Sequence, residues 1–270
     1  MFMKKTLLFI AMMATILTGC TKQEKVLVLY YSQTGTTQTV AEELQKQLGA
    51  DIERIEAAVP YDGDFKATIE RSGKERESGE VPELNPLNIN LNNYDVIFLG
   101  YPIWFGTYAM PIATLVKENE FAGKTIVPFC TFGSGGLGSS IENLKQALPK
   151  ADVRQGYGVR QARIEAAPKE IERFLIENGY KEGSVAPLPD YSEQVPVTEE
   201  DSLVFDAACS GYQFPLGTPV TVGKRETEEN TDYKFTVKSR GFNGEEGTST
   251  IYVTVGNDEN AKPEFTEVVR

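Results

Sequence analysis

The sequence predicts an α/β fold, a doubly wound five-stranded parallel sheet, followed by a small C-terminal α+β domain with an antiparallel sheet. Two observations predict it. Up to about residue 180, short apolar runs rich in β-branched residues alternate with segments of helical periodicity, which is typical of right-handed βαβ units. After residue 197, apolar and polar residues alternate one by one, which is typical of antiparallel strands with one buried face.

The strands of the first domain, expected over residues 21–183, are indicated by its apolar runs. Val26–Tyr31 and Asp95–Gly100 are almost continuously apolar, as parallel strands buried on both faces are. In chain order, the expected strands are 26–31, 51–59, 95–100, 125–130 and a weaker one at 152–159.

Helices are predicted between these strands, where apolar residues recur three or four positions apart. In chain order, they are marked by Val40, Leu44 and Leu48; by residues 111–119; by Ile141, Leu144 and Leu148; and by Ile171, Phe174 and Leu175. The charged segment 62–80 is expected to form a solvated helix with a loop, and residues 101–108 a loop.

The second domain is expected over residues 198–270, after a linker at 184–197 that contains three prolines. Thr198 is followed by three acidic residues, which predicts a capped helix start. The antiparallel strands are predicted from two sets of alternating apolar residues: Tyr233, Phe235 and Val237, and Ile251, Val253 and Val255.

The composition limits what the protein can do. Its 270 residues are 40% hydrophobic, enough for packed cores. The net charge of −12 argues against a nucleic-acid partner, because phosphate contacts need a basic surface. The chain has no histidine, which excludes Ser-His-Asp and Cys-His nucleophilic catalysis. No metal site is predicted, and no catalytic side chain is assigned.

The first twenty residues are typical of an export signal. Lys4 and Lys5 precede an apolar run, Thr6–Leu17, which is too short to span a bilayer. The following Leu-Thr-Gly-Cys resembles the bacterial lipobox, and the resemblance implies lipidation of Cys20. We therefore expect a lipid-anchored membrane lipoprotein of the bacterial cell envelope. The alternative is an ordinary cleaved signal peptide that happens to contain a cysteine.

Ligands of open α/β sheets bind beyond the carboxyl ends of the strands, which directs attention to three loops. The first, Ser32–Thr37 (SQTGTT), offers hydroxyl groups, a glycine and a helix N-terminus, a combination that binds phosphate. It contains no Lys or Arg, so it is not a Walker A loop. The alternative interpretation is a threonine-rich helix cap.

The other two loops suit a flat ring. Tyr101–Gly106 (YPIWFG) is unusually apolar for a loop and holds the only tryptophan, which a stacked heteroaromatic ligand would explain; core packing is the alternative. The stretch 131–138 contains Gly133, Gly135 and Gly138 in a GxGxxG pattern. Because the pattern follows the fourth strand and not the first, it is weak evidence for a dinucleotide fingerprint, and a loop whose backbone approaches the edge of a flat ring fits it equally well.

With these loops, residues 26–180 resemble a flavodoxin, of the branch with a YPIWWG-type loop, and the resemblance implies FMN as the cofactor. It implies contacts to the FMN phosphate from Ser32, Thr34, Gly35, Thr36 and Thr37. It implies contacts to the isoalloxazine from Pro102, Ile103, Trp104, Phe105 and Gly106. It implies contacts to the pyrimidine edge from Thr131, Phe132, Gly133, Ser134 and Gly135.

Residues 198–270 resemble a cystatin-like domain, in which one helix is gripped by a curved antiparallel sheet. Cystatins inhibit with a Gln-x-Val-x-Gly hairpin, whereas the corresponding stretch here, 218–223, reads TPVTVG and lacks the glutamine. We expect a docking or structural module, not a protease inhibitor.

The function expected from these features is electron transfer by an FMN flavoprotein tethered to the cell envelope, with a redox protein or a small acceptor as partner. Apolar walls, the cofactor phosphate and an acidic protein predict a low potential for the second one-electron reduction of FMN. Two alternatives stay open. One is an NAD(P)H-dependent reductase of quinone-type acceptors, and the other is a binding protein without flavin.

Overall fold

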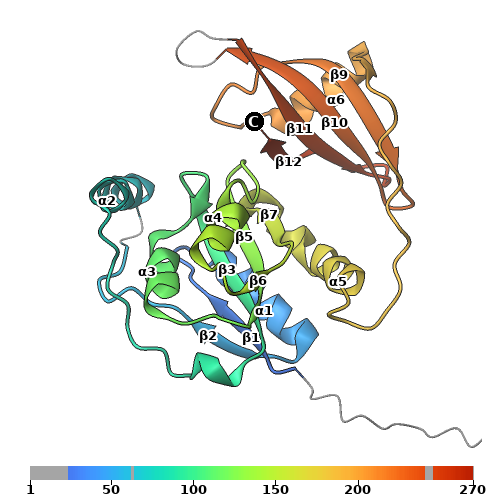
Figure 1. The fold of residues 1–270 in the computed structure, drawn as a ribbon. Helices are drawn as coiled ribbons and strands as arrows, with labels where there is room; N and C mark the ends of the chain where they lie inside the picture. The colour runs from blue at the N-terminus through green and yellow to red at the C-terminus, as the bar shows by residue number, and fades with distance from the viewer. Residues whose placement is uncertain (1–23, 62–63, 241–245, 270) are drawn as a thin grey trace, which may run out of the picture.

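The computed structural model describes residues 24–61, 64–240 and 246–269, which form two units, each around its own sheet (Figure 1). The predicted signal peptide and Cys20 lie outside the described residues. Among the residues that are described, no helix combines the length and the apolar character needed to cross a membrane.

The first unit is a parallel sheet with the strand order β2-β1-β3-β5-β6. Its strands are β1 (Val26–Tyr30), β2 (Asp51–Arg54), β3 (Val96–Trp104), β5 (Thr125–Phe132) and β6 (Asp152–Val153). A further strand, β7 (Tyr157–Arg160), also pairs with β5 in parallel. The predicted doubly wound five-stranded sheet is confirmed.

Helices cover both faces of this sheet. On one face, α1 (Thr36–Leu48) and α5 (Ala167–Glu177) bury Val40, Leu44, Ile171 and Leu175 against the strands. On the other face, α3 (Met110–Glu118) and α4 (Ser140–Ala147) pack against a second core. The outlying α2 (Phe65–Ser78) and the short helices η1 (Leu91–Asn93) and η2 (Gln161–Ala166) complete the unit.

Three elements differ from the prediction. The second strand, expected over 51–59, ends at Arg54, because the chain then turns to form a bridge between Ala57 and Leu84. The fifth strand, expected over 152–159, is split into β6 and β7. Between them, Gly156 lies so close to the carbonyl of Pro128 that a side chain would collide with it.

The third difference lies in residues 101–108, which were expected to form a loop. Here β3 continues to Trp104 and pairs with β4 (Thr107–Tyr108) in a tight hairpin. Its two turn residues, Phe105 and Gly106, have φ values of 52° and 74°. Positive φ at both positions matches the twist of the flanking strands, so the apolar loop is a rigid turn.

The second unit is an antiparallel sheet with the strand order β12-β11-β10-β9-β8, as predicted in type. Phe235 and Ile251 point from the sheet into a core that Phe205 of α6 closes. β10 and β11 contain the two predicted alternating sets, and β9 contains the stretch 218–223 that was compared with the cystatin hairpin. The other two strands had no counterpart in the prediction: β8 lies in the segment expected as a linker, and β12 ends the described chain. The elements are β8 (Val195–Pro196), α6 (Glu199–Cys209), β9 (Thr218–Glu226), β10 (Asn230–Arg240), β11 (Glu246–Gly256) and β12 (Glu264–Val269).

The second unit sits over the carboxyl ends of the parallel strands. In Figure 1, β12 is the strand of the upper sheet that lies nearest α4 and β7. The main-chain N–H of Val268 in β12 donates to the carbonyl oxygen of Ser134, directly after β5, at 2.8 Å. Residues more than 130 positions apart in the sequence therefore meet at the edge of the first sheet where ligands of this fold class bind.

Candidate functional site

The three predicted loops meet at one edge of the parallel sheet. They lie at the carboxyl ends of β1, β3 and β5, three neighbouring strands of the sheet. The hydroxyl oxygens of Thr37 and Thr131 lie 2.8 Å apart and join the first loop to the third. Gly106 in the hairpin accepts hydrogen bonds from the N–H and hydroxyl of Ser139, at 3.1 and 3.0 Å. The structure thus brings the predicted site residues together.

The N-terminus of α1 is open to an anion. Its cap residue is Gly35, with a φ of 92° and no side-chain cap. The main-chain N–H groups of Thr36, Thr37 and Gln38 donate to no other described residue; the first internal bond of the helix is that of Thr39 to the Gly35 carbonyl. Unsatisfied N–H groups at a helix N-terminus carry partial positive charge and bind phosphate.

The hydroxyl groups of this loop divide into two sets. Ser32 is buried, and its oxygen accepts the N–H of Gly35 at 3.2 Å, which shapes the turn. Thr34 is exposed and Thr36 half-buried, with 3.4 Å between their hydroxyl oxygens. These two threonines are therefore the ones that can reach a ligand at the surface of the loop.

Arg54 at the end of β2 is a cation that the sequence interpretation missed. Its guanidinium donates to the carbonyl oxygen of Ser32 at 3.0 Å and to the side-chain oxygen of Gln38 at 3.2 Å. It supplies the positive charge that the SQTGTT loop itself lacks. No signal in the sequence indicated this role, because the strand was expected to run to residue 59 and its end at Arg54 appears only in the structure.

The two aromatic residues of the hairpin have different environments. Trp104 is only 8% exposed, and its ring packs edge to face with Tyr31 and Tyr61, at centroid distances of 5.8 and 5.0 Å. Phe105, at the tip of the turn, is 49% exposed. The predicted contact of Trp104 with a flat ligand stays a prediction, and the accessible ring of this loop belongs to Phe105.

Helix α2 borders two of the loops, a role not expected of the charged segment 62–80. The amide of Gln33 donates to the hydroxyl of Thr68. On the same helix, Gly73 faces the Phe105 ring, and the guanidinium of Arg76 lies 5.4 Å from the centre of that ring. The helix therefore connects the SQTGTT loop to the aromatic hairpin.

The glycine-rich loop after β5 keeps its hydrogen-bond donors available. No main-chain N–H of residues 133–138 donates to another described residue. Its carbonyl groups are engaged, since Arg160 donates to the Gly133 oxygen at 2.7 Å and Val268 to the Ser134 oxygen. Ser134, Gly136 and Leu137 are buried or half-buried, and N–H groups in such places need acceptors, so this loop can receive the carbonyl groups of a ring.

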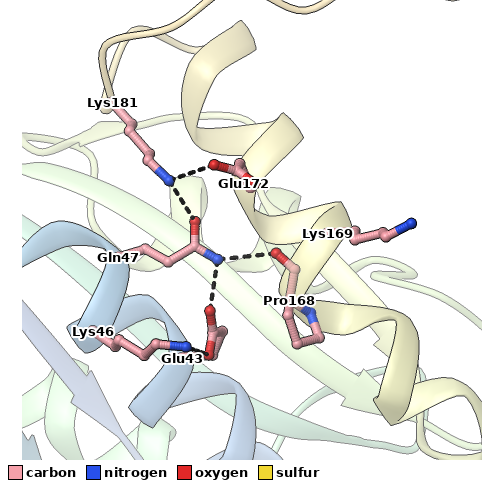
Figure 2. Close-up of a pocket in the computed structure, with 7 residues that line it drawn as sticks. All are labelled: Glu43, Lys46, Gln47, Pro168, Lys169, Glu172 and Lys181. Carbon is pink, nitrogen blue, oxygen red and sulfur yellow. Dashed lines mark hydrogen bonds and ion pairs between the residues drawn. The ribbon is translucent and has the colours of Figure 1, made fainter.

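A polar hollow between α1 and α5 is a different kind of feature (Figure 2). Its groups satisfy one another: Gln47 donates to Glu43 and to the Pro168 carbonyl, at 2.8 and 2.9 Å, and Lys181 pairs with Glu172 at 2.7 Å. Its lining residues therefore do not form a set of free donors like the N–H groups of residues 36–38 and 133–138. We interpret it as the seam between two helices.

A family model described as flavodoxin matches residues 25–172. Among solved structures, a flavoprotein from Bacteroides uniformis is 30% identical, with a TM-score of 0.50 over 55% of this chain and 98% of its own. One from Bacteroides eggerthii is 33% identical over the same shares, with a TM-score of 0.47. A flavoprotein from Lactobacillus acidophilus, solved in complex with FMN, is 23% identical over 56% and 97%, with a TM-score of 0.46. No curated protein matches the chain. The second unit lies outside the family match.

Proposed function

Since the chain belongs to the flavodoxin family, we propose that it binds FMN at the three loops and transfers electrons between a reduced donor and an acceptor. The observation that carries this proposal is a set of main-chain N–H groups, at residues 36–38 and 133–138, that donate to no other described residue. They lie in two segments joined by the Thr37–Thr131 contact. One set is at a helix N-terminus, which suits a phosphate, and the other suits the carbonyl groups of a ring.

The residues present fit FMN. The start of α1, the hydroxyls of Thr34 and Thr36, and Arg54 would hold the phosphate. Phe105 and the loop after β5 would border the ring system. FMN supplies the redox chemistry when bound, and the protein contributes binding, orientation and nearby charge. No side chain has to give or take a proton, so no catalytic residue is needed.

The test is reconstitution of the purified protein with FMN, followed by desalting and a visible absorption spectrum. Retained flavin bands are expected, and a colourless protein overturns the proposal. A redox titration of the loaded protein should place the second one-electron reduction below the potential of free FMN, because the phosphate and the acidic protein disfavour added negative charge. Rapid oxidation of NADH or NADPH would instead favour a reductase.

Arg54→Gln should weaken FMN binding about threefold to tenfold and leave riboflavin binding unchanged. Arg54 is hydrogen-bonded to the SQTGTT loop, so its positive charge attracts the FMN phosphate, a group that riboflavin lacks. The effect is moderate because Arg54 is exposed and solvent partly screens its charge. Lys46→Gln is the matched control, because it removes the same charge at the far end of α1. Fluorescence titrations measure both ligands. Equal losses for FMN and riboflavin would contradict a phosphate contact.

We further propose that Cys20 is lipidated and that the protein acts at the bacterial cell envelope. The Leu-Thr-Gly-Cys sequence after a basic and apolar start supports this. A Cys20→Ala variant that stays in the membrane fraction of the native host would contradict the lipid anchor.

For the second domain, which has a single helix across an antiparallel sheet, we propose the role of a docking or structural module of cystatin-like type.

A further inference from the structure

The contact between the two domains is centred on the glycine-rich loop after β5. Tyr212, which follows α6, donates its hydroxyl to that of Ser134 at 2.6 Å. The Val268 N–H of β12 bonds the Ser134 carbonyl at 2.8 Å. The carboxylate of Glu267 lies over Gly136, where any side chain at position 136 would collide with it. The second domain therefore holds this loop through several residues at once.

Arg160, at the end of β7, connects the loop to the second domain. Its guanidinium donates to the carbonyl oxygens of Gly133, at 2.7 Å, and of Phe265, at 3.2 Å. It also lies 4.5 Å from the centre of the Phe265 ring and 5.6 Å from that of Tyr212. The Arg160 side chain thus donates to a carbonyl oxygen of each domain, and the planar guanidinium fixes the directions of these two hydrogen bonds.

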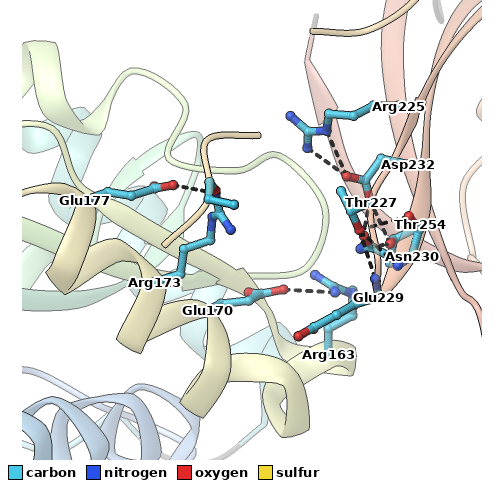
Figure 3. Close-up of polar contacts among 11 residues, drawn as sticks. Arg163, Glu170, Arg173, Glu177, Arg225, Thr227, Glu229, Asn230, Asp232 and Thr254 are labelled. Carbon is cyan, nitrogen blue, oxygen red and sulfur yellow. Dashed lines mark hydrogen bonds and ion pairs between the residues drawn. The ribbon is translucent and has the colours of Figure 1, made fainter. Parts of the chain in front are cut away.

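Two ion-pair contacts lie at the periphery of the same interface and help to orient the second domain on the first. Arg163 pairs with Glu170 of α5 and with Glu264 of β12, both at 2.9 Å. Figure 3 shows Arg163 and Glu170 facing the polar network of the β9–β10 hairpin. The pair Lys169–Glu229, at 3.7 Å, is largely exposed on both sides, so it contributes little.

These contacts engage carbonyl oxygens and the Ser134 hydroxyl of the loop, but none of its main-chain N–H groups. The second domain and Arg160 take the carbonyl oxygens of Gly133 and Ser134, whereas the N–H groups of residues 133–138 bond no other described residue. A loop with four glycines in six positions has the most backbone freedom to lose when it orders. Ordering such a loop in advance removes that cost from ligand binding.

We propose that the C-terminal domain orders the loop 133–138 for FMN, with Arg160 and Tyr212 as positioning residues, so that FMN binding and domain docking are coupled. This inference rests on the proposed function. Coupling is reciprocal: the docked domain raises the affinity for FMN, and bound FMN tightens the docking of β12. Neither Tyr212 nor β12 belongs to the part of the chain that matches the flavodoxin family.

The experiment combines FMN titration with hydrogen exchange in the full chain. Arg160→Gln should weaken FMN binding about tenfold, and Tyr212→Phe, which removes one hydroxyl, about twofold to fivefold. Added FMN should slow amide exchange in β12, where the Val268 N–H bonds the loop, and less so in both variants. Slower exchange at β12 is a readout that a merely structural role of these residues would not produce.

Two controls separate coupling from general damage. Lys169→Ala removes the exposed domain pair and should change neither measurement. Tyr233→Phe removes a hydroxyl from β10, where the ring stacks on Phe235, and should also be silent. If the wild type binds FMN but exchange in β12 does not change, and Arg160→Gln binds FMN normally, the coupling is overturned while the proposed function stands. If the wild type binds no FMN, both are overturned.

Discussion

Gly35→Val is expected to weaken FMN binding about 100-fold or more, the largest functional effect of the substitutions considered. Gly35 caps α1 with a φ of 92°, a conformation that β-branched residues avoid. Open space surrounds the position of the added Cβ, so strain, not collision, drives the change. The turn must rotate to relieve it, and the N–H groups at the start of α1 then lose their common direction. Two lost charge-assisted bonds, at about 1.5 kcal/mol each, give this factor.

The matched control is Gly49→Val at the other end of the same helix. Gly49 also has positive φ, 62°, and nothing lies near its absent Cβ. Both variants should therefore lose about 1–2 kcal/mol of unfolding free energy, but only Gly35→Val should lose FMN affinity. Urea unfolding and FMN fluorescence titration measure the two quantities. Equal affinities in the two variants would show that the phosphate binds elsewhere.

The sequence is sufficient for the fold class of the first unit and for the order of its main strands along the chain. A strand that is buried on both faces needs apolar residues at nearly every position, so a continuous apolar run such as Val26–Tyr30 predicts such a strand directly. The loops at residues 32–37 and 131–138 could be recognised because their glycine and hydroxyl residues stand next to one another in the sequence, between a strand and a helix. The glycine-rich loop meets the SQTGTT loop through the Thr37–Thr131 contact, although β3 lies between the two strands that these loops follow.

The contributions that the sequence did not reveal come from residues distant in the chain. Arg54 becomes part of the site only because β2 pairs with β1, and Tyr212 only because the second domain lies over β5. A lone Arg at a strand end or a lone Tyr after a helix carries no periodic signal. Helix α2 was interpreted as solvated because its charged residues outnumber its apolar ones, although Thr68 and Ser72 on one face are buried.

Asp201→Ala should destabilise the second domain by about 2–3 kcal/mol. Asp201 is only 1% exposed, and its carboxylate accepts the N–H and hydroxyl of Thr198, at 3.0 and 2.8 Å, to close the capping box of α6. Its other oxygen lies 2.6 Å from the Lys224 ammonium of β9. Alanine removes the bonds that the carboxylate accepts from Thr198 and the ion pair with Lys224, whereas the Thr198 hydroxyl still accepts the main-chain N–H of residue 201. Because Lys224 is 39% exposed, water takes up its charge in the variant, which keeps the loss below that of a fully buried pair.

The pH dependence of this loss identifies its origin. Burial raises the pKa of the Asp201 carboxyl, but the bonds from Lys224 and Thr198 together outweigh it and hold the pKa below its ordinary value of 3.8. A lowered folded-state pKa gives stability that is present above the unfolded-state value and is lost as the pH falls through the folded-state value. The difference between wild type and Asp201→Ala should therefore be constant near neutral pH and shrink below about pH 4. Asp206→Ala, on the exposed side of the same helix, should stay within about 0.5 kcal/mol of the wild type. A difference that persists unchanged at pH 2 would mean that packing around α6, and not the carboxylate, anchors this helix to the sheet.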